Sequence, residues 1–437
     1  MICQRITNQV WQRMIKLLGS TESSEKLLKT NRLYCSQPTS ETNHSLHSRS
    51  QLFQYRKWDI NQLRAVLSDA PTLNDIINRE QIIPFLAATN YREFSQIASR
   101  SLKDDNKVFE TTIPLSSDIR LRKLYENPFG LLRLGRVLED LDAVSALAAL
   151  YHVGREDVNC VTAAVDGVRL HNQPWSPVYD LIYHSKVTYT GKTSMNISLI
   201  VEQKIPTEST KLIMEADFVY VARNLEGTQS IPVPPLRARN EEEQASFERA
   251  ALKQLLRKEK AKRNVAVSVP TIDEQMHLHQ MFKRGVQPDE EIYMSQVTIG
   301  STHFMLPDER NMYGFTFGGV LMRKAYELAF VNNYLAFQQR PIAVEVGDIS
   351  FIKSVPVGSI LELHSSVVYT KDAYQVVLVD AMVNNLMHDP PTKERTNTFN
   401  FVLKTGKPVK KIFPVSYEES MKYISGRRML DDVLARI

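Results

Sequence analysis

The strongest constraint on the fold of this chain is an internal repeat, whose two copies are offset by about 180–184 residues. Each copy opens with an Asn-x-x-Gly turn, at 127–130 and 311–314, and continues into a helical run of apolar residues. A strand-like segment that ends in aspartate follows, at Asp166 and Asp348. Chance does not account for features that recur in the same order, so we expect two versions of one folding unit.

The elements inside each copy predict the α+β fold class. A long helix is expected at 137–150 and again at 320–331, and β-branched and aromatic residues dominate the segments that follow. The pattern His-Ser-x-Val-x-Tyr-Thr occurs at 184–190 and at 364–370. Such a unit packs its helix on an antiparallel sheet. One helix cannot cover both faces of a sheet, so we expect two units side by side with one continuous sheet.

Composition and charge exclude several classes of protein. The 437 residues are 43% apolar and 24% charged, which is typical of a globular protein with two or three domains. No apolar run approaches the roughly 18–20 residues that a membrane span needs. The three widely spaced cysteines indicate neither a disulfide framework nor a metal site, and no motif indicates a cofactor.

The net charge of +5 does not indicate a nucleic-acid partner. Between Met1 and Tyr34 there are six basic residues and two acids, which leaves about +1 for the rest of the chain. A nucleic-acid interface needs a broad basic surface, and such a balance does not supply one.

The leader at 1–34 has the features of a mitochondrial transit peptide. Its first twenty residues contain Arg5, Arg13 and Lys16 but no acid, with apolar residues at helical spacing among them. The segment at 32–36 resembles a matrix-processing site with arginine at minus three, which predicts cleavage after Tyr34. We therefore expect the mitochondrial matrix, and an ordinary flexible N-terminus is the alternative.

Shifts in composition predict the remaining boundaries. Residues 35–104 are expected to form an N-terminal extension, and 105–235 the first α+β unit. Three prolines close that unit, and the next segment is dense in charge with apolar residues at helical spacing. We expect a charged helical linker at 236–290, and at 291–437 the second unit with a C-terminal helical tail.

The second copy resembles a known family. The stretch at 311–329, in which a Gly-Phe-Thr-Phe-Gly-Gly turn opens the helix, is similar to the helix motif of hotdog acyl-CoA thioesterases. Together with 135–142 and 187–195, it resembles the mitochondrial acyl-coenzyme A thioesterase 9/10-type branch, over about residues 105–437. The resemblance implies a tandem double hotdog, in which an antiparallel β-sheet wraps each long helix. It also implies an acyl-CoA substrate, its hydrolysis to free acid and CoA, and a homo-oligomer.

Thioester hydrolysis requires donors for the carbonyl oxygen, a water, and a base or nucleophile beside it. A glycine-rich turn that enters a helix can supply the donors, because the backbone approaches closely and the first N–H groups are free. Gly314, Gly318 and Gly319 fit this substrate-binding role, while Gly130 and Gly135 are the poorer equivalent. Tight turns or close packing are the structural alternative for each glycine.

Two helix carboxylates compete for the role of base. In the family's pattern the acid stands seven residues after the last glycine of the turn, as Asp142 does after Gly135. Seven steps of ~100° return to nearly the same face of a helix. In the second copy this position is Tyr326, and Glu327 is displaced and has Arg323 four residues before it. Asp142 is therefore preferred, with a pKa raised by partial burial.

Asn127 and Asn311 are expected to orient the water or assist the carbonyl. Asn127 precedes a proline, which also fits a helix N-cap with proline at the first helical position. The resemblance implies sites that pair the asparagine of one unit with the acid of the other. Asn311 with Asp142 is then the competent site, and Asn127 with Glu327 the weaker one.

Two other functions remain open. Phe317 stands where many thioesterases of this fold have histidine, so any role of that histidine is absent. A hotdog hydratase or dehydratase would need an Asp and His pair near the helix, and His152 lies at the far end of the first helix. A non-catalytic acyl-CoA-binding or assembly module would also fit the uneven copies.

Overall fold

The computed structural model describes most of the chain after residue 107. The described ranges are 108–155, 157–171, 173–206, 210–225, 227–238, 240–262, 269–309, 315–386 and 392–436. The predicted transit peptide and the N-terminal extension, together with Asn311 and Gly314, lie outside these ranges.

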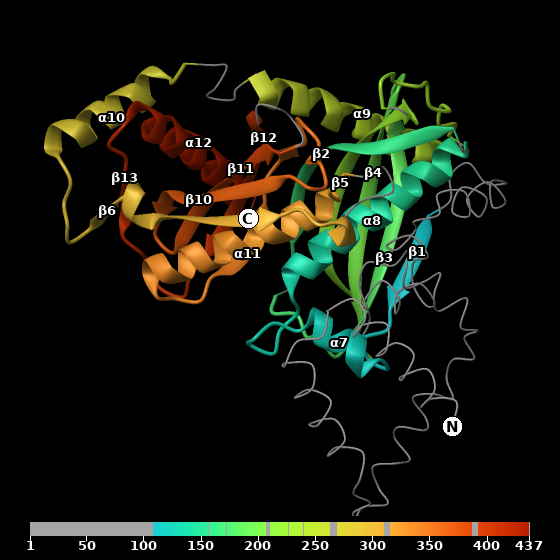
Figure 1. The fold of residues 1–437 in the computed structure, drawn as a ribbon, viewed down its shortest axis with the longest axis horizontal. Helices are drawn as coiled ribbons and strands as arrows, with labels where there is room; N and C mark the ends of the chain where they lie inside the picture. Colours follow the sequence, from blue (N-terminus) through green and yellow to red (C-terminus); the bar gives the residue numbers. More distant parts are fainter. Residues whose placement is uncertain are drawn as a thin grey trace, which may run out of the picture. The chain divides into compact units, whose positions relative to one another are not determined.

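The first half of the fold is a long helix packed on antiparallel strands (Figure 1). The expected helix at 137–150 is confirmed as α8 (Leu134–Val153), and the short α7 (Ile119–Tyr125) precedes it. The strands of this half are β1 (Phe109–Ile113), β2 (Val158–Leu170), β3 (Asp180–Thr190), β4 (Ser194–Lys204) and β5 (Lys211–Asn224). α8 packs on β2, β3, β4 and β5, where its apolar side chains are buried.

The second half repeats this arrangement around α11 (Gly318–Phe337), which confirms the helix expected at 320–331. Its strands are β7 (Thr298–Phe304), β8 (Ile342–Val346), β9 (Ile349–Ser350), β10 (Ile360–Lys371), β11 (Tyr374–Asn385) and β12 (Thr392–Lys404). The remaining elements are α9 (Glu241–Lys262), α10 (Ile272–Arg284), α12 (Tyr417–Leu434), β6 (Glu291–Tyr293), β13 (Lys411–Phe413), η1 (Met294–Val297) and η2 (Pro307–Glu309).

One antiparallel sheet runs through both halves. Within the described part of the chain it has eleven strands, ordered β1-β3-β4-β5-β2-β8-β12-β11-β10-β7, and β9 pairs with β2 beside this path. The order β1-β3-β4-β5-β2 in the first half corresponds to β7-β10-β11-β12-β8 in the second. The halves join where β2 pairs with β8, with Val168 opposite Val346. The predicted α+β double hotdog with a continuous sheet is thus confirmed.

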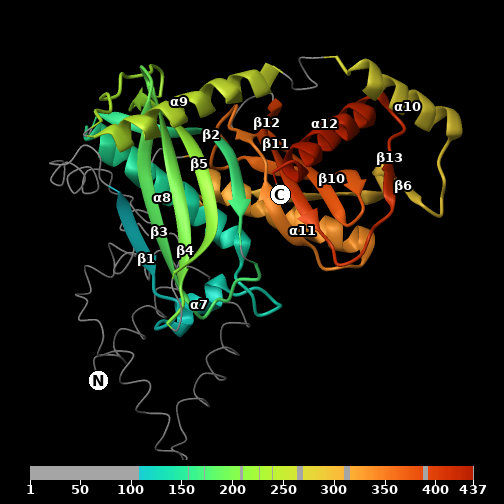
Figure 2. The same cartoon turned by 180° about the vertical axis from the view of Figure 1, so that it is seen from behind.

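Further helices cover parts of the sheet. α12 packs on β10 and β11, and α9 packs on β3 (Figure 2). Five successive residues of β11, 375–379, are buried, which requires cover on both faces and is supplied by α11 and α12. No helix in the described ranges is long and apolar enough to cross a membrane.

The two long helices approach each other at glycines near their N-termini. A Cβ atom added to Gly319 would lie 2.8 Å from the Cα and carbonyl oxygen of Glu139 on α8. A Cβ atom on Gly135 would lie 3.0 Å from side-chain atoms of Arg323 and Glu327 on α11. The contact at Gly319 is with backbone, which cannot turn aside as a side chain can. Glycine at this position is therefore a requirement of the helix crossing.

We expect Gly319→Ala to lower the free energy of unfolding by roughly 1–3 kcal/mol, because the added methyl group forces the helices apart. Urea denaturation followed by circular dichroism measures this change. Gly406→Ala is the matched control, since a Cβ atom there meets nothing within 4 Å. Equal effects of the two substitutions would contradict the close crossing.

Candidate active site between the repeats

Asp142 connects the two repeats through its carboxylate. The residue lies on α8 and is only 1% exposed. Its Oδ2 accepts a hydrogen bond of 2.7 Å from the backbone N–H of Gly319, the second residue of α11. Its Oδ1 accepts hydrogen bonds from the hydroxyls of Thr162 on β2 (2.9 Å) and Tyr220 on β5 (3.2 Å). One buried carboxylate therefore contacts two helices and the sheet.

The N-terminus of α11 lacks a cap from its own repeat. Its N-cap residue, Phe317, has no side-chain acceptor for the first N–H groups of the helix. Unsatisfied N–H groups and the helix dipole favour a negative charge at this position. The carboxylate of Asp142 supplies that charge from the other repeat.

Gly318 presents a second backbone donor beside the same carboxylate. No residue within the described ranges accepts a hydrogen bond from its N–H. A Cβ atom at Gly318 would lie 2.9 Å from Oδ2 of Asp142. The glycine therefore keeps this end of the helix open, and its N–H can serve a ligand oxygen. The N–H of Gly319 differs, because Asp142 already occupies it.

Burial raises the pKa of Asp142 to about 6. Hydrogen bonds from Thr162, Gly319 and Tyr220 favour the ionised form and limit this rise, while the nearby charge of Glu139 adds to it. A carboxyl group with this pKa can be ionised at neutral pH and still accept a proton readily. The expectation of a raised pKa at this position is therefore supported by its environment.

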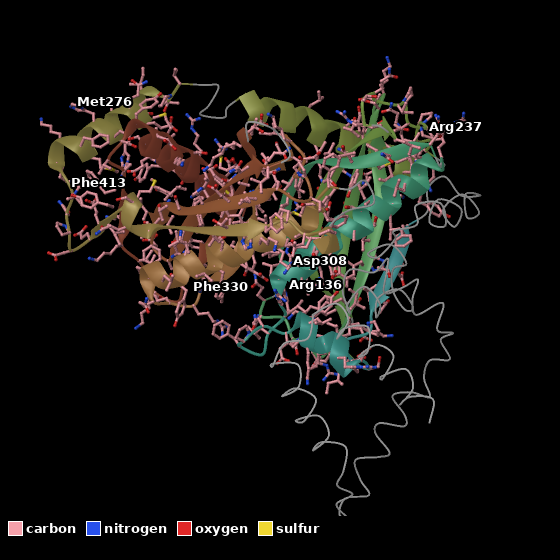
Figure 3. All side chains as sticks on the ribbon, viewed as in Figure 1. Arg136, Arg237, Met276, Asp308, Phe330 and Phe413 are labelled. Carbon is pink, nitrogen blue, oxygen red and sulfur yellow. The ribbon has the colours of Figure 1, made fainter. Side chains whose placement is uncertain are left out.

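A chain of ion pairs flanks the carboxylate. Glu139 on α8 binds Arg136 of the same helix (2.8 Å) and Arg323 of α11 (3.0 Å). Glu309 continues the chain to Arg323 (3.4 Å) and Lys324 (2.9 Å). Arg136 is labelled in Figure 3 on α8. The pair of Glu139 with Arg323 joins the two helices, and both arginines compensate the charge of Glu139 close to Asp142.

The corresponding position in the second repeat has a different chemistry. Tyr326 replaces Asp142 there, and its ring packs on Phe401 at 5.7 Å and on Phe330 at 6.4 Å between centroids. Phe330 also contacts Phe129, with centroids 6.2 Å apart, and is labelled in Figure 3. Aromatic rings therefore fill the position that a buried carboxylate occupies in the first repeat.

Glu327 is a half-exposed partner of an arginine. Its Oε1 accepts hydrogen bonds of 2.9 and 2.6 Å from Nε and Nη2 of Arg133, the N-cap residue of α8. The side chains of both residues are more than a third exposed, at 38% and 37%. An exposed ion pair of this kind stabilises little, and the carboxylate is already neutralised by its partner.

Asn127 organises its own turn. Its Oδ1 accepts hydrogen bonds from the N–H groups of Phe129 (2.9 Å) and Leu131 (3.1 Å), and its Nδ2 donates to the carbonyl of Leu132. Gly130 in this turn has a φ of 71°, which favours glycine. The alternative of an N-cap followed by proline is wrong, because α8 begins at Leu134.

The structure thus brings Asp142, Gly318 and Gly319 together, and it separates them from Glu327. Two partners of Asp142, Thr162 and Tyr220, were not among the residues predicted from the sequence. None of the side chains bonded to Asp142 is a histidine, in contrast to the pair that a hydratase would need. Within the described ranges, no group of three or more His, Cys, Asp or Glu residues could hold a metal ion.

Comparison with known proteins relates this chain to mitochondrial thioesterases. The acyl-coenzyme A thioesterase 9, mitochondrial, of Homo sapiens is 33% identical over 345 residues, which cover 75% of this chain and 77% of the human protein. The chain belongs to this family. Acyl-coenzyme A thioesterase 10, mitochondrial, of Mus musculus is 32% identical and covers the chain equally.

Two further comparisons complete this result. No protein-family model matches the chain. A putative oleoyl thioesterase of Lactobacillus plantarum, a solved structure, aligns with a TM-score of 0.43 and 10% identity over 69% of this chain and 97% of its own.

The raised pKa of Asp142 predicts a pH-dependent stability difference between the wild type and Asp142→Asn. The folded pKa lies above the unfolded value of 3.8, so the ionised form is costly in the fold. The wild type should lose roughly 2–3 kcal/mol relative to the variant as the pH rises from about 4 to about 7. Urea denaturation at several pH values measures the difference. Asp432→Asn, at an exposed position on α12, is the control for the substitution itself.

Proposed function

We propose that this chain hydrolyses acyl-CoA thioesters to a free carboxylic acid and CoA. The observation that carries the proposal is the buried carboxyl of Asp142, held at the N-terminus of α11 with a pKa raised to about 6. Family membership supports the substrate class, because the relatives are named acyl-coenzyme A thioesterases.

Asp142 acts in this proposal as the general base. Its ionised carboxylate takes a proton from a water molecule, whose oxygen attacks the thioester carbonyl carbon. The C–O bond forms, the C–S bond breaks, and the departing thiolate of CoA takes the proton back from Asp142. The pKa near neutrality supports both transfers, since the group can accept the proton and release it.

The N–H of Gly318 is the proposed donor to the carbonyl oxygen as it becomes negative. It lies at the positive end of the α11 dipole and has no acceptor among the described residues. The N–H of Gly319 then holds Asp142 in place and is not itself the oxyanion donor. Asn311, which precedes α11 in the sequence, is proposed to orient the water or the carbonyl together with Gly314.

We further propose one competent site in each chain. The site with Asp142 has a buried carboxylate and a free backbone donor, while the second position has Tyr326 among aromatic rings. Glu327 is held by Arg133, and Asn127 is held by its own turn. These contacts support the second site as the degenerate one.

The cellular setting forms part of the proposal. The relatives are named mitochondrial, and this agrees with a leader at 1–34 that directs the chain to the matrix. The mature chain would comprise an extension at 35–104, hotdog units at 105–235 and 291–437, and a linker at 236–290, in a homo-oligomer of such protomers.

Thiol release from a panel of acyl-CoAs tests the activity directly. The purified mature chain should release CoA thiol, and Asp142→Asn should lower kcat by roughly 10²–10⁴-fold, as the loss of a general base does. Asn311→Ala should also lower kcat, while Glu327→Gln should leave it within about threefold, as expected for an exposed pair. If no acyl-CoA of any chain length were cleaved, the chain would instead be a binding or assembly module.

The pH profile tests the assignment of the base. The base must be ionised, so kcat/KM should rise about tenfold per pH unit below about pH 6 and level off above it. Rates measured between pH 4.5 and 8.5 with a saturable short-chain acyl-CoA give this profile. A profile without an acidic limb near pH 6 would remove Asp142 from the role.

A further inference from the structure

Two buried hydroxyl groups lie behind the carboxylate of Asp142. Tyr220 on β5 and Ser145 on α8 are both 0% exposed. Their hydroxyl oxygens are 2.9 Å apart, and either can donate to the other. The Tyr220 hydroxyl can donate to Oδ1 of Asp142 (3.2 Å) or to its backbone carbonyl (3.0 Å), and that of Ser145 can donate to the same carbonyl (2.9 Å).

This polar group is confined to the repeat that carries the carboxylate. At the repeat spacing, Asp142 corresponds to Tyr326 and Thr162 to Val344. The hydroxyl pair corresponds to two residues without a hydroxyl, Ala329 and Phe401. The second repeat has the same fold without the carboxylate or either hydroxyl, so packing of the fold alone does not require the hydroxyls of Ser145 and Tyr220.

The Tyr220 proton has three possible acceptors: Oδ1 of Asp142, the backbone carbonyl of Asp142, and the hydroxyl oxygen of Ser145. When Asp142 is ionised, its Oδ1 is the strongest acceptor, and the Tyr220 proton should turn toward it. When Asp142 is protonated, that attraction falls and the Tyr220 proton can turn to the carbonyl of Asp142 at 3.0 Å. Rotation of one hydroxyl proton is enough for this exchange, and no heavy atom needs to move.

We propose that Tyr220, held in place by Ser145, is a positioning residue whose hydroxyl proton follows the charge of Asp142 during the reaction. The inference rests on the proposed function of Asp142 as the base. Tyr220 itself stays neutral, because burial raises its pKa well above the ordinary value. It therefore acts as a hydrogen-bond donor throughout the cycle and never as an acid that is consumed.

The remaining groups that face Asp142 come from three elements. Thr162 on β2 donates to Oδ1, and Gly319 on α11 donates to Oδ2. Glu139 on α8 is the charged group whose field acts on Asp142, and it is paired with Arg136 and Arg323. Thr162 also shares a hydrogen bond with the Tyr220 hydroxyl, so removal of that hydroxyl leaves Thr162 with Oδ1 of Asp142 as its partner.

The test is Tyr220→Phe, which places the residue of the second repeat at this position. Loss of one donor to the ionised form should raise the pKa of Asp142 and move the acidic limb of kcat/KM upward by about half to one pH unit. Activity at pH 6 should fall about two- to fivefold, and activity above pH 8 should change little. Ser145→Ala should shift the limb in the same direction by a smaller amount, because the Tyr220 hydroxyl loses its support.

Tyr183→Phe is the matched control. Its hydroxyl is equally buried and also donates to an aspartate of α8, but that aspartate is Asp140 (3.0 Å). We expect this variant to lose stability without a shift of the acidic limb. If the acidic limb of kcat/KM lies at the same pH in Tyr220→Phe, Ser145→Ala and the wild type, the inference is overturned.

Other outcomes separate this inference from the proposed function. If the wild type releases no thiol, the function itself fails. If Tyr220→Phe does not fold, the shift in Ser145→Ala decides the question, together with the titration of the Asp142 carboxyl by NMR in both proteins. A carboxyl that titrates at the same pH in wild type and Ser145→Ala contradicts the role of the hydroxyl pair.

Discussion

The hydrogen bond between Asp142 and the N–H of Gly319 is the interaction on which the rest of this site depends. It places a buried carboxylate from one repeat at the positive end of a helix from the other. Neither repeat contains this arrangement alone, because α8 supplies the acid and α11 supplies the donors. The glycine is required because a side chain at this position would collide with the backbone of α8 at Glu139. The proposed chemistry of Asp142 and the packing of α8 on α11 therefore depend on the same contact.

Duplication explains how such a contact arises and why it occurs in only one of two equivalent positions. The strand order of the second half corresponds to that of the first, so the backbone offers two related sites. At one of them Asp142, Thr162 and Tyr220 form a polar group, while at the other Tyr326 and Phe401 pack as aromatic rings. Burying a carboxyl is costly and needs hydrogen-bond partners. The second position accordingly lacks both the carboxylate and its hydroxyl partners.

The ion pairs beside the site have a second consequence. The charge of Glu139 contributes to the raised pKa of Asp142. Arg136 and Arg323 both pair with Glu139, and the pair with Arg323 joins α8 to α11. The same ion pairs thus lie between the two helices and beside the carboxyl of Asp142.

Much of this protein could be predicted from its sequence alone. The repeat, the two long helices, the α+β class and the burial of Asp142 on the glycine face all follow from local pattern and period. These features depend on residues that are near each other along the chain. The family resemblance at 311–329 follows from local sequence in the same way, and it led to the correct family.

Only the tertiary structure determined which groups meet at the carboxylate. Thr162 and Tyr220 lie 20 and 78 residues from Asp142, and Gly319 lies 177 residues away, so no helical or strand period connects them. The hydrogen bond from the Gly319 N–H to Asp142 depends on the helix crossing. So does the position of the Gly318 N–H, which has no acceptor among the described residues. The side chain of Asn127 likewise accepts its hydrogen bonds from its own turn. The proline that follows it suggests a helix N-cap instead. Sequence period determines which face a residue occupies, and packing between distant segments determines what that face contacts.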